Sequence, residues 1–335
     1  MELEKLYRYT GNENQLFGVR RLILDDGNAR GAVIYNVTTA GGLDFDILAD
    51  TGLDLGRLKF QGLNINYMTK NGYDCSNKFL PVPDNFDHTF PGGMLYTCGL
   101  LSVGPQCYDT DGDNEFHPLH GRYHGISASN IYAYVDDERE NIYVGGEVRE
   151  TEQWRHVLSL KRKYKIPVYG SEIIINDTIT NLTPDPVEYE MLYHVNFGWP
   201  FLSEKTILKL PENCKTTPRT DYAREKISEQ CVFSSPIDDE AECVYFNEVD
   251  KNCVPRAEVI NNDLKITAVL EWSNDTLPRL SQWKSMRSGE YVLGLEPSTC
   301  YTMGRAEERK HGELRILKGF GVIKNSVKLS FRKEL

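Results

Sequence analysis

The stretch Leu158-Ser-Leu-Lys-Arg-Lys-Tyr-Lys-Ile166 carries the clearest structural signal in the chain. Apolar or aromatic side chains occupy every second position, serine or lysine fills the positions between them, and only Arg162 breaks the apolar series. Alternation with a period of two is typical of a β-strand that has one face in the core and one face in water. The sequence therefore predicts a half-buried strand here.

A turn and a second alternating segment follow directly. The segment Pro167-Val-Tyr-Gly170 holds the proline and glycine that favour a turn, and residues 171–181 are rich in β-branched side chains that alternate again. Two alternating runs joined by a short turn are typical of an antiparallel strand pair.

Similar short runs recur along the chain, separated by glycine, asparagine, aspartate and proline, at residues 32–38, 45–48, 141–148, 188–195, 264–272, 291–296 and 326–331. The 19 tyrosines and 13 phenylalanines also favour strands over helices. This pattern predicts an all-β fold, a large antiparallel β-sandwich with few short helices. Since no repeat or linker-like shift in composition is present, we expect a single domain over residues 1–335.

Two polar stretches, residues 71–88 and 216–230, are expected to form surface loops. The second is expected to include a short helix through residues 222–227.

Composition argues against several classes of function. Acidic residues outnumber basic ones by 49 to 38, and the one basic run, Lys161-Arg-Lys-Tyr-Lys165, is too short to follow a nucleic-acid backbone. We therefore expect no nucleic-acid partner and no membrane partner. The first residues, Met1-Glu-Leu-Glu-Lys-Leu-Tyr7, lack the basic and apolar segments of an export signal, so a cytoplasmic location is expected.

The cysteines are scattered and form neither a CxxC pair nor a zinc-site spacing. A chain of this length can build a core without disulfides, so free thiols in a reducing cytoplasm are the favoured interpretation. The eight are Cys75, Cys98, Cys107, Cys214, Cys231, Cys243, Cys253 and Cys300.

Three of the seven histidines lie in one glycine-punctuated segment, Phe116-His-Pro-Leu-His-Gly-Arg-Tyr-His-Gly125. Loops on a rigid sheet often carry functional residues, but a loop can also hold merely solvated histidines, which is the favoured interpretation for His117 and His124. The spacing is not that of a metal site, and we expect no metal.

His194 and Glu296 have a different setting. His194 lies in the aromatic-rich run Met191-Leu-Tyr-His-Val-Asn-Phe-Gly-Trp-Pro200, with Asn196 on the same face of the expected strand. Glu296 ends an apolar run and precedes Pro297; if it is buried, its pKa rises and it can accept a proton near neutral pH. A hydrogen-bonded core histidine and a surface glutamate are the plainer alternatives.

Two further segments carry side chains that suit sugar binding. Leu277-Pro-Arg-Leu-Ser-Gln-Trp-Lys284 places an indole beside a cation, and Asp50-Thr-Gly-Leu-Asp-Leu-Gly-Arg57 places carboxylates and a guanidinium among glycines. Aromatic faces and paired polar groups bind pyranose rings and their hydroxyls. Either segment could equally be a structural turn, and neither has the pattern of a phosphate-binding loop.

Taken together, these segments resemble the aldose 1-epimerase (galactose mutarotase-like) superfamily, and more closely its DUF4432 branch. The resemblance spans nearly the whole chain, and several ordered motifs are more specific than any single one. The motifs are Asp54-Leu-Gly-Arg57, Gly93-Met-Leu-Tyr-Thr-Cys-Gly99, Pro118-Leu-His-Gly-Arg122, Leu192-Tyr-His-Val-Asn-Phe-Gly198, Trp283-Lys284 and Gly294-Leu-Glu-Pro-Ser-Thr299.

The resemblance implies a mutarotase-like supersandwich that interconverts the anomers of a free aldose. It implies that His194 acts as the acid, that Glu296 acts as the base and that His120 stabilises charge on the anomeric oxygen. Neither a metal nor a redox cofactor is implied, and the partner is a small sugar. The expected substrate contacts are Arg57, Asp54, Arg122, Asn196, Trp283 and Lys284.

The chain also departs from typical mutarotases. It has His-Val-Asn-Phe at residues 194–197, where they have His-x-Tyr-Phe-Asn, and it offers no counterpart of their substrate-binding aspartate. Two alternatives therefore stay open, a non-catalytic sugar-binding protein on the same scaffold and an enzyme of another class, such as a lyase or hydrolase. The oligomeric state is not encoded in any recognisable pattern.

Overall fold

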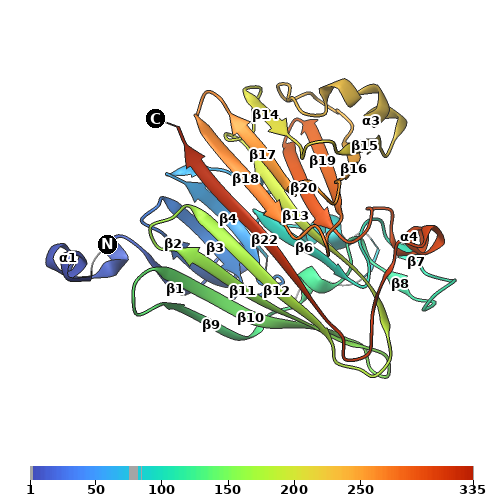
Figure 1. The fold of residues 1–335 in the computed structure, drawn as a ribbon, viewed down its shortest axis with the longest axis horizontal. Helices are drawn as coiled ribbons and strands as arrows, with labels where there is room; N and C mark the ends of the chain where they lie inside the picture. The colour runs from blue at the N-terminus through green and yellow to red at the C-terminus, as the bar shows by residue number, and fades with distance from the viewer. Residues whose placement is uncertain (1–2, 75–81, 84, 335) are drawn as a thin grey trace.

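A computed structural model describes residues 3–74, 82–83 and 85–334 of the protein (Figure 1). Strands dominate these residues, as the alternating segments predict. The α-helices that the structure describes are short: α1 (Leu3–Tyr9), α2 (Asn85–Thr89), α3 (Asp221–Glu225) and α4 (Arg305–His311). Single turns of 3-10 helix occur at Glu13–Gln15, Gly27–Ala29, Tyr123–Gly125 and Ile227–Glu229.

The largest sheet has eight antiparallel strands, and the first segment identified in the sequence lies within it. Its order is β14 (Thr206–Lys209), β17 (Arg256–Asn261), β18 (Ile266–Trp272), β22 (Val322–Lys333), β12 (Glu172–Asn181), β11 (Val157–Pro167), β10 (Asn141–Thr151) and β9 (Ser129–Val135). In β11, Leu160 and Tyr164 are buried while Lys161 and Lys163 are exposed. β11 pairs with β12 antiparallel, which confirms the predicted pair.

A second sheet of seven strands carries the long strand β13. Its order is β15 (Lys215–Pro218), β16 (Cys243–Glu248), β19 (Arg279–Arg287), β20 (Glu290–Ser298), β13 (Val187–Gly198) and β21 (Arg315–Leu317), and β6 (Leu95–Leu100) also pairs with β13. Twelve residues long, β13 contacts three neighbours along its length.

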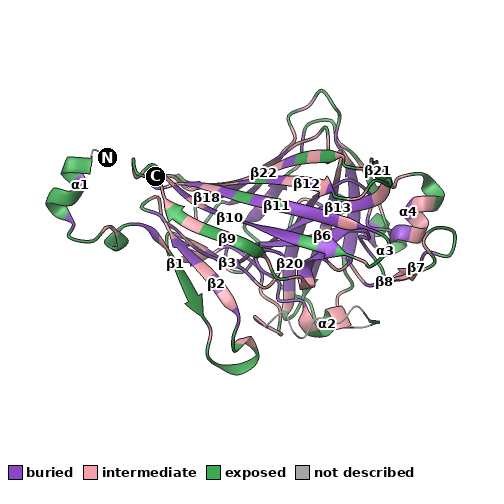
Figure 2. Ribbon diagram, turned by 90° about the horizontal axis from the view of Figure 1, so that it is seen from below, coloured by how far each residue is buried: buried purple, intermediate pink, exposed green. Residues whose placement is uncertain are grey.

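A five-stranded sheet and a two-stranded ribbon complete the strands. The sheet is β1 (Gly18–Ile23), β2 (Val33–Thr38), β3 (Leu43–Leu48), β4 (Asp54–Phe60) and β5 (Leu63–Asn64), and the ribbon is β7 (Cys107–Tyr108) with β8 (Phe116–His117). One apolar cluster joins the three large sheets, with Phe45, Leu160 and Phe197 as members from each of them. Figure 2 shows buried strands at the centre of the molecule and exposed residues on the outer strands and turns. The prediction of a large antiparallel sandwich is confirmed.

The two polar stretches are more structured than expected. Residues 216–230 contain the expected short helix, α3, but they begin within strand β15. Of residues 71–88, 75–81 and 84 lie outside the described residues, and the end of the stretch forms helix α2 instead of a loop.

All described cysteines are free thiols, as expected, and Cys75 lies outside the described residues. None of the helices that the structure describes has the length and apolar composition needed to cross a bilayer.

Arg162, the residue that breaks the apolar series of β11, is fully buried. Its guanidinium binds both oxygens of Asp177 on β12, the nearer at 2.7 Å, and forms an ion pair with Asp54 on β4. The hydroxyl of Thr97 on β6 accepts a further bond from Arg162 at 3.0 Å and donates to Asp54 at 2.6 Å. The phenol of Tyr193 on β13 donates to Asp177 at 2.8 Å. These five side chains therefore tie the three large sheets together.

We expect Arg162→Met to lower the free energy of unfolding by about 3–5 kcal/mol, because it leaves the carboxylates of Asp54 and Asp177 buried without their cation. Urea unfolding followed by circular dichroism measures this loss. The matched control is Lys161→Met on the exposed face of the same strand, for which a change within about 0.5 kcal/mol is expected. Equal stabilities of the two variants would show that the network does not hold the sheets together.

Candidate active site

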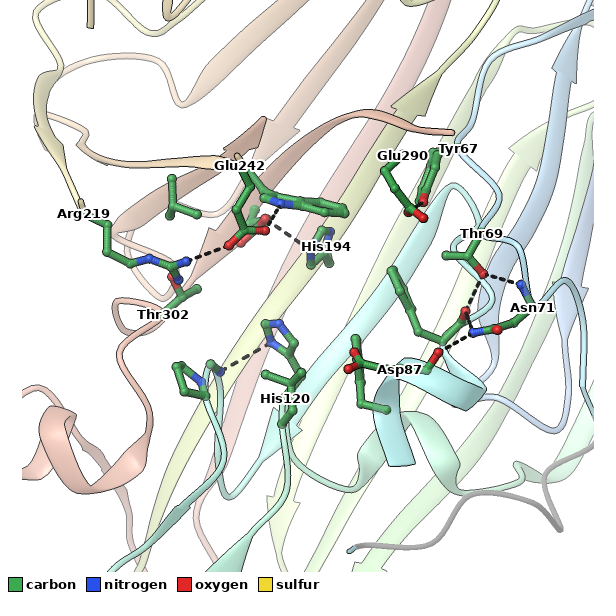
Figure 3. A pocket seen from close by; sticks show the side chains of 18 of the residues that line it. Tyr67, Thr69, Asn71, Asp87, His120, His194, Arg219, Glu242, Glu290 and Thr302 are labelled. Carbon is green, nitrogen blue, oxygen red and sulfur yellow. Dashed lines mark hydrogen bonds and ion pairs between the residues drawn. The ribbon is translucent and has the colours of Figure 1, made fainter. Parts of the chain in front are cut away.

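The cavity on the seven-stranded sheet has a volume of about 540 Å³ and is lined by residues from several distant segments (Figure 3). Four residues singled out in the sequence line it, namely His120, His194, Trp283 and Glu296. The other lining residues fall into two groups. One group surrounds helix α2 and consists of Tyr67, Thr69, Lys70, Asn71, Phe86, Asp87 and Phe90. The other group comes from loops and strand ends and consists of Gly104, Pro105, Leu119, Arg219, Glu242, Val244, Glu290 and Thr302.

The pairing of β13 with β20 brings His194 and Glu296 together. Val195 pairs with Leu295 in this antiparallel ladder, so His194 and Glu296 occupy the next opposed position with their side chains on one face. Both side chains are buried, and His194 Nε2 lies 3.2 Å from Glu296 Oε1. The two residues form an acid/base pair in contact, which we call the dyad.

Gly294 leaves the room that the dyad needs. A Cβ atom at this position would lie 2.9 Å from Glu296 Oε1 and 2.9 Å from His194 Cε1. Atoms in contact at that distance must shift, so any larger side chain would disturb the dyad.

Burial sets the protonation of the dyad. It raises the pKa of Glu296 to about 8, with Arg219 opposing the shift and Glu242 adding to it. It lowers the pKa of His194 to about 4, opposed by the nearby Asn196 side chain, which favours the charged imidazole. At neutral pH the dyad therefore holds one proton, carried by the carboxyl group, and has no net charge.

His120 lies beside the dyad in a strained turn. Its φ of 60° is in the left-handed region, and two hydrogen bonds to Gly104 hold it: its N–H donates to the Gly104 carbonyl at 2.9 Å, and its Nδ1 accepts from the Gly104 N–H at 3.4 Å. Since Nδ1 is an acceptor, the ring proton is on Nε2. Burial keeps the pKa of His120 well below its usual range. The ring is therefore a neutral N–H donor, 5.9 Å from the His194 ring between centroids.

Trp283 forms an aromatic wall next to the dyad. Its half-buried indole packs edge-on against His194, with ring centroids 5.4 Å apart, and against Tyr67 at 6.3 Å. The indole Nε1–H donates to Glu242 at 2.8 Å, which fixes the orientation of the ring.

Two ion pairs that the sequence did not single out also line the cavity. Arg219 lies 3.0 Å from Glu242, and Lys70 lies 2.6 Å from Glu290, which also accepts the Tyr67 hydroxyl at 2.7 Å. These charged residues come one at a time from separate loops and strand ends. Isolated charges in polar segments carry no sequence signal of a site.

The other predicted substrate contacts lie outside the cavity lining. Asp54 belongs to the buried Arg162 network and is fully inaccessible. Lys284 follows Trp283 in β19, so it points to the opposite face, where its Nζ donates to the carbonyls of Glu229 and Val232. For both, the structure replaces the expected sugar contact with a structural role.

Arg57, Arg122 and Asn196 also have other partners. Arg57 pairs with Asp44 at 3.1 Å and Asp46 at 3.4 Å, and Arg122 donates to the carbonyl of Phe116. The Asn196 amide donates to the backbone carbonyls of Gly93 and His194, so its hydrogen bonds hold the backbone next to the dyad.

His117 and His124 are buried, contrary to the expectation of solvated loop histidines. His117 Nε2 contacts Asp113 at 2.9 Å, and His124 stacks on Tyr96 with centroids 4.7 Å apart. The segment that contains them packs into the protein instead of lying on its surface.

One group of side chains among the described residues has the spacing of a cation site, namely Asp109, Asp113 and His117. Arg309 lies 2.6 Å and Arg305 lies 3.0 Å from Asp109 Oδ2. These guanidinium groups already neutralise the carboxylate, so the arrangement is that of an ion-pair network.

We expect infrared spectra at neutral pH to contain the carbonyl band of a protonated Glu296 carboxyl, and this band should vanish as the pH rises through about 8. The difference spectrum between the wild type and Glu296→Gln isolates it. Burial also raises the pKa of Glu190 to about 8, so Glu190→Gln is the control and must retain the Glu296 band. An ionised Glu296 at neutral pH would contradict the assignment of the proton.

The chain matches the DUF4432 family, a domain of unknown function, over residues 29–330. No curated protein shows significant similarity to it. Its structure is similar to that of a Klebsiella pneumoniae protein provisionally described as an aldose 1-epimerase, with a TM-score of 0.89, 23% identity, and coverage of 96% of this chain and 87% of that one.

Two further solved structures share the fold. A galactose mutarotase-like protein from Clostridium acetobutylicum has a TM-score of 0.69 and 16% identity, covering 96% of this chain and 100% of the other. A galactose 1-epimerase from Lactobacillus acidophilus has a TM-score of 0.64 and 12% identity, covering 95% and 100%. The chain therefore belongs to the DUF4432 family and has the galactose mutarotase-like fold.

Proposed function

We propose that the protein is an aldose 1-epimerase, a mutarotase that interconverts the α and β anomers of a free sugar. The observation that supports this most is the dyad, a buried carboxyl and imidazole in contact at a cavity that also holds a neutral histidine donor and an indole wall. The shared fold with a galactose 1-epimerase is consistent with the proposal.

The reaction requires two proton transfers and one bond rotation. Before the ring opens, the proton of the dyad passes from Glu296 to His194, which the contact between Nε2 and Oε1 permits. The Glu296 carboxylate then takes the proton of the anomeric hydroxyl, and the His194 imidazolium donates its proton to the ring oxygen as the bond from that oxygen to C1 breaks. The open-chain aldehyde rotates about its C1–C2 bond and closes on the other face, and both protons return.

His120 and Trp283 assist without carrying protons. The Nε2–H of His120 donates a hydrogen bond to the oxygen at C1, where negative charge develops as the ring opens. The face of the Trp283 indole packs against the C–H groups of the sugar ring and excludes water from the dyad. Glu242, which is paired with Arg219, accepts the indole N–H and so holds the ring in this orientation.

The purified protein is expected to accelerate the change in optical rotation of a freshly dissolved α-aldose. Glu296→Gln and His194→Asn should each reduce kcat/KM by roughly 10²-fold or more, since each removes one partner of the proton exchange. Glu190→Gln is the matched control, because it alters a buried glutamate on β13 that lies outside the cavity lining, and it should keep its activity.

The sugars tested in this polarimetric assay should include neutral, phosphorylated and acidic ones. Absence of acceleration for all of them would refute the enzymatic proposal. Saturable sugar binding without a rate effect would indicate the non-catalytic alternative, and cleaved products in mass spectrometry would indicate a lyase or hydrolase.

A bell-shaped pH dependence of kcat/KM is expected, with apparent pKa values of about 4 and about 8 that belong to the dyad as a whole. Below the lower value both groups are protonated and no base remains, and above the upper value both are deprotonated and no acid remains. Polarimetry with subtraction of the uncatalysed rate measures the profile. His120→Gln should lower the rate but keep both limbs, because both limbs come from the titration of the dyad. An unchanged rate above pH 8 would contradict the role of Glu296.

A further inference from the structure

The cavity is larger than one hexose requires. Liquid water occupies about 30 Å³ per molecule, so the twelve non-hydrogen atoms of a hexose take at most about 360 Å³ even if each needs as much room as a water. The cavity holds about 540 Å³. At least about a third of it stays open when a single ring lies at the dyad.

The lining extends well beyond the dyad. In Figure 3, His120 and His194 lie between Arg219 and Thr302 on one side and Asn71 and Asp87 on the other. Asp87 comes from helix α2, which lies far along the chain from both members of the dyad. The cavity therefore has a second end, formed by α2 and residues 69–71, which we call the α2 end.

An aromatic surface joins the α2 end to the catalytic histidines. Phe86 and Phe90 stack on each other with centroids 4.9 Å apart. The Phe86 ring lies 5.4 Å from the His120 ring, and the Phe90 ring lies 6.2 Å from the His194 ring. Next to these rings are the carboxylate of Asp87 and the side chain of Asn71. Flat aromatic faces beside polar groups bind sugar rings, whose C–H faces are apolar and whose edges carry hydroxyls.

The charges of the lining disfavour an anionic ligand. The two cations that line the cavity among the described residues, Lys70 and Arg219, are each paired with a carboxylate. With Glu296 protonated at neutral pH, the three carboxylates of Asp87, Glu242 and Glu290 and these two cations give the lining one net negative charge. A phosphate or carboxylate on the substrate would find no unpaired cation there and would be repelled.

We propose that the substrate is an uncharged reducing disaccharide, or a longer chain, whose reducing ring lies at the dyad and whose second ring packs on Phe86 at the α2 end. This substrate class rests on the proposed mutarotase function. With such a substrate the two ends of the cavity have different roles. The chemistry takes place on the first ring at the dyad, and the second ring supplies affinity at the α2 end.

The test compares free aldoses with disaccharides that carry the same aldose at the reducing end, such as glucose with maltose, cellobiose and melibiose. Glucose 6-phosphate serves as the anionic probe. Dissociation constants come from calorimetry and kcat/KM from polarimetry. At least one disaccharide should bind at least tenfold more tightly than its parent aldose, and the phosphate at least tenfold more weakly.

Variants of α2 locate the effect. Phe86→Ala and Asp87→Asn should each reduce the affinity ratio of disaccharide to monosaccharide to near one. The matched control is His88→Gln, which changes the next residue of the same helix, exposed and outside the cavity lining, and should leave the ratio unchanged.

The outcomes separate the two proposals. Equal affinity for an aldose and all its disaccharides, or no disaccharide binding at all, overturns the α2 subsite even if mutarotation is observed. If disaccharides bind more tightly through Phe86 but mutarotation is not accelerated, the second-ring site at the α2 end is supported and only the enzymatic function is refuted. Tighter binding of glucose 6-phosphate overturns the preference for an uncharged ligand.

Discussion

The buried guanidinium of Arg162 is the interaction on which the rest of the structure depends, because it joins strands of all three large sheets. Asp54 belongs to the five-stranded sheet, Asp177 to the eight-stranded sheet, and Thr97 and Tyr193 to the seven-stranded sheet. Unpaired buried charges are costly, so the carboxylates and the guanidinium must meet for the protein to fold. The sheets are thereby fixed relative to one another at a point directly behind the cavity.

The position of the dyad follows from this constraint through strand β13. Tyr193 and His194 are consecutive, so they point to opposite faces of the strand. Tyr193 donates to Asp177 in the network, and His194 faces the cavity opposite Glu296. A slip of one residue in the pairing of β13 with β20 would exchange these faces and place the tyrosine in the cavity. Gly294 has no room for a side chain, and the absence of one allows His194 and Glu296 to approach each other next to it.

Sequence patterns predicted the fold because alternation reports which residues face the core, and β11 and β12 follow it closely. The same rule of period two shows why Lys284 was misplaced, since it follows Trp283 in one strand and must point the other way. Asp54 was misplaced for another reason: a buried carboxylate and a sugar-binding carboxylate look alike until the partner, Arg162, is seen. The Arg219–Glu242 and Lys70–Glu290 pairs were missed because their members come from distant segments, and only the folded chain brings them to one cavity.

The location of the single proton connects the burial of the dyad to its chemistry. The proposed mechanism uses His194 as the acid and Glu296 as the base, whereas burial favours the proton on Glu296 in the ligand-free protein. The two arrangements differ only by transfer across the contact of 3.2 Å and carry the same total charge. A cavity that disfavours net charge therefore does not oppose the exchange, and hydroxyls of a bound sugar can stabilise the charge-separated form. Mutarotation needs this property, because ring closure reverses ring opening and each group must donate in one direction and accept in the other.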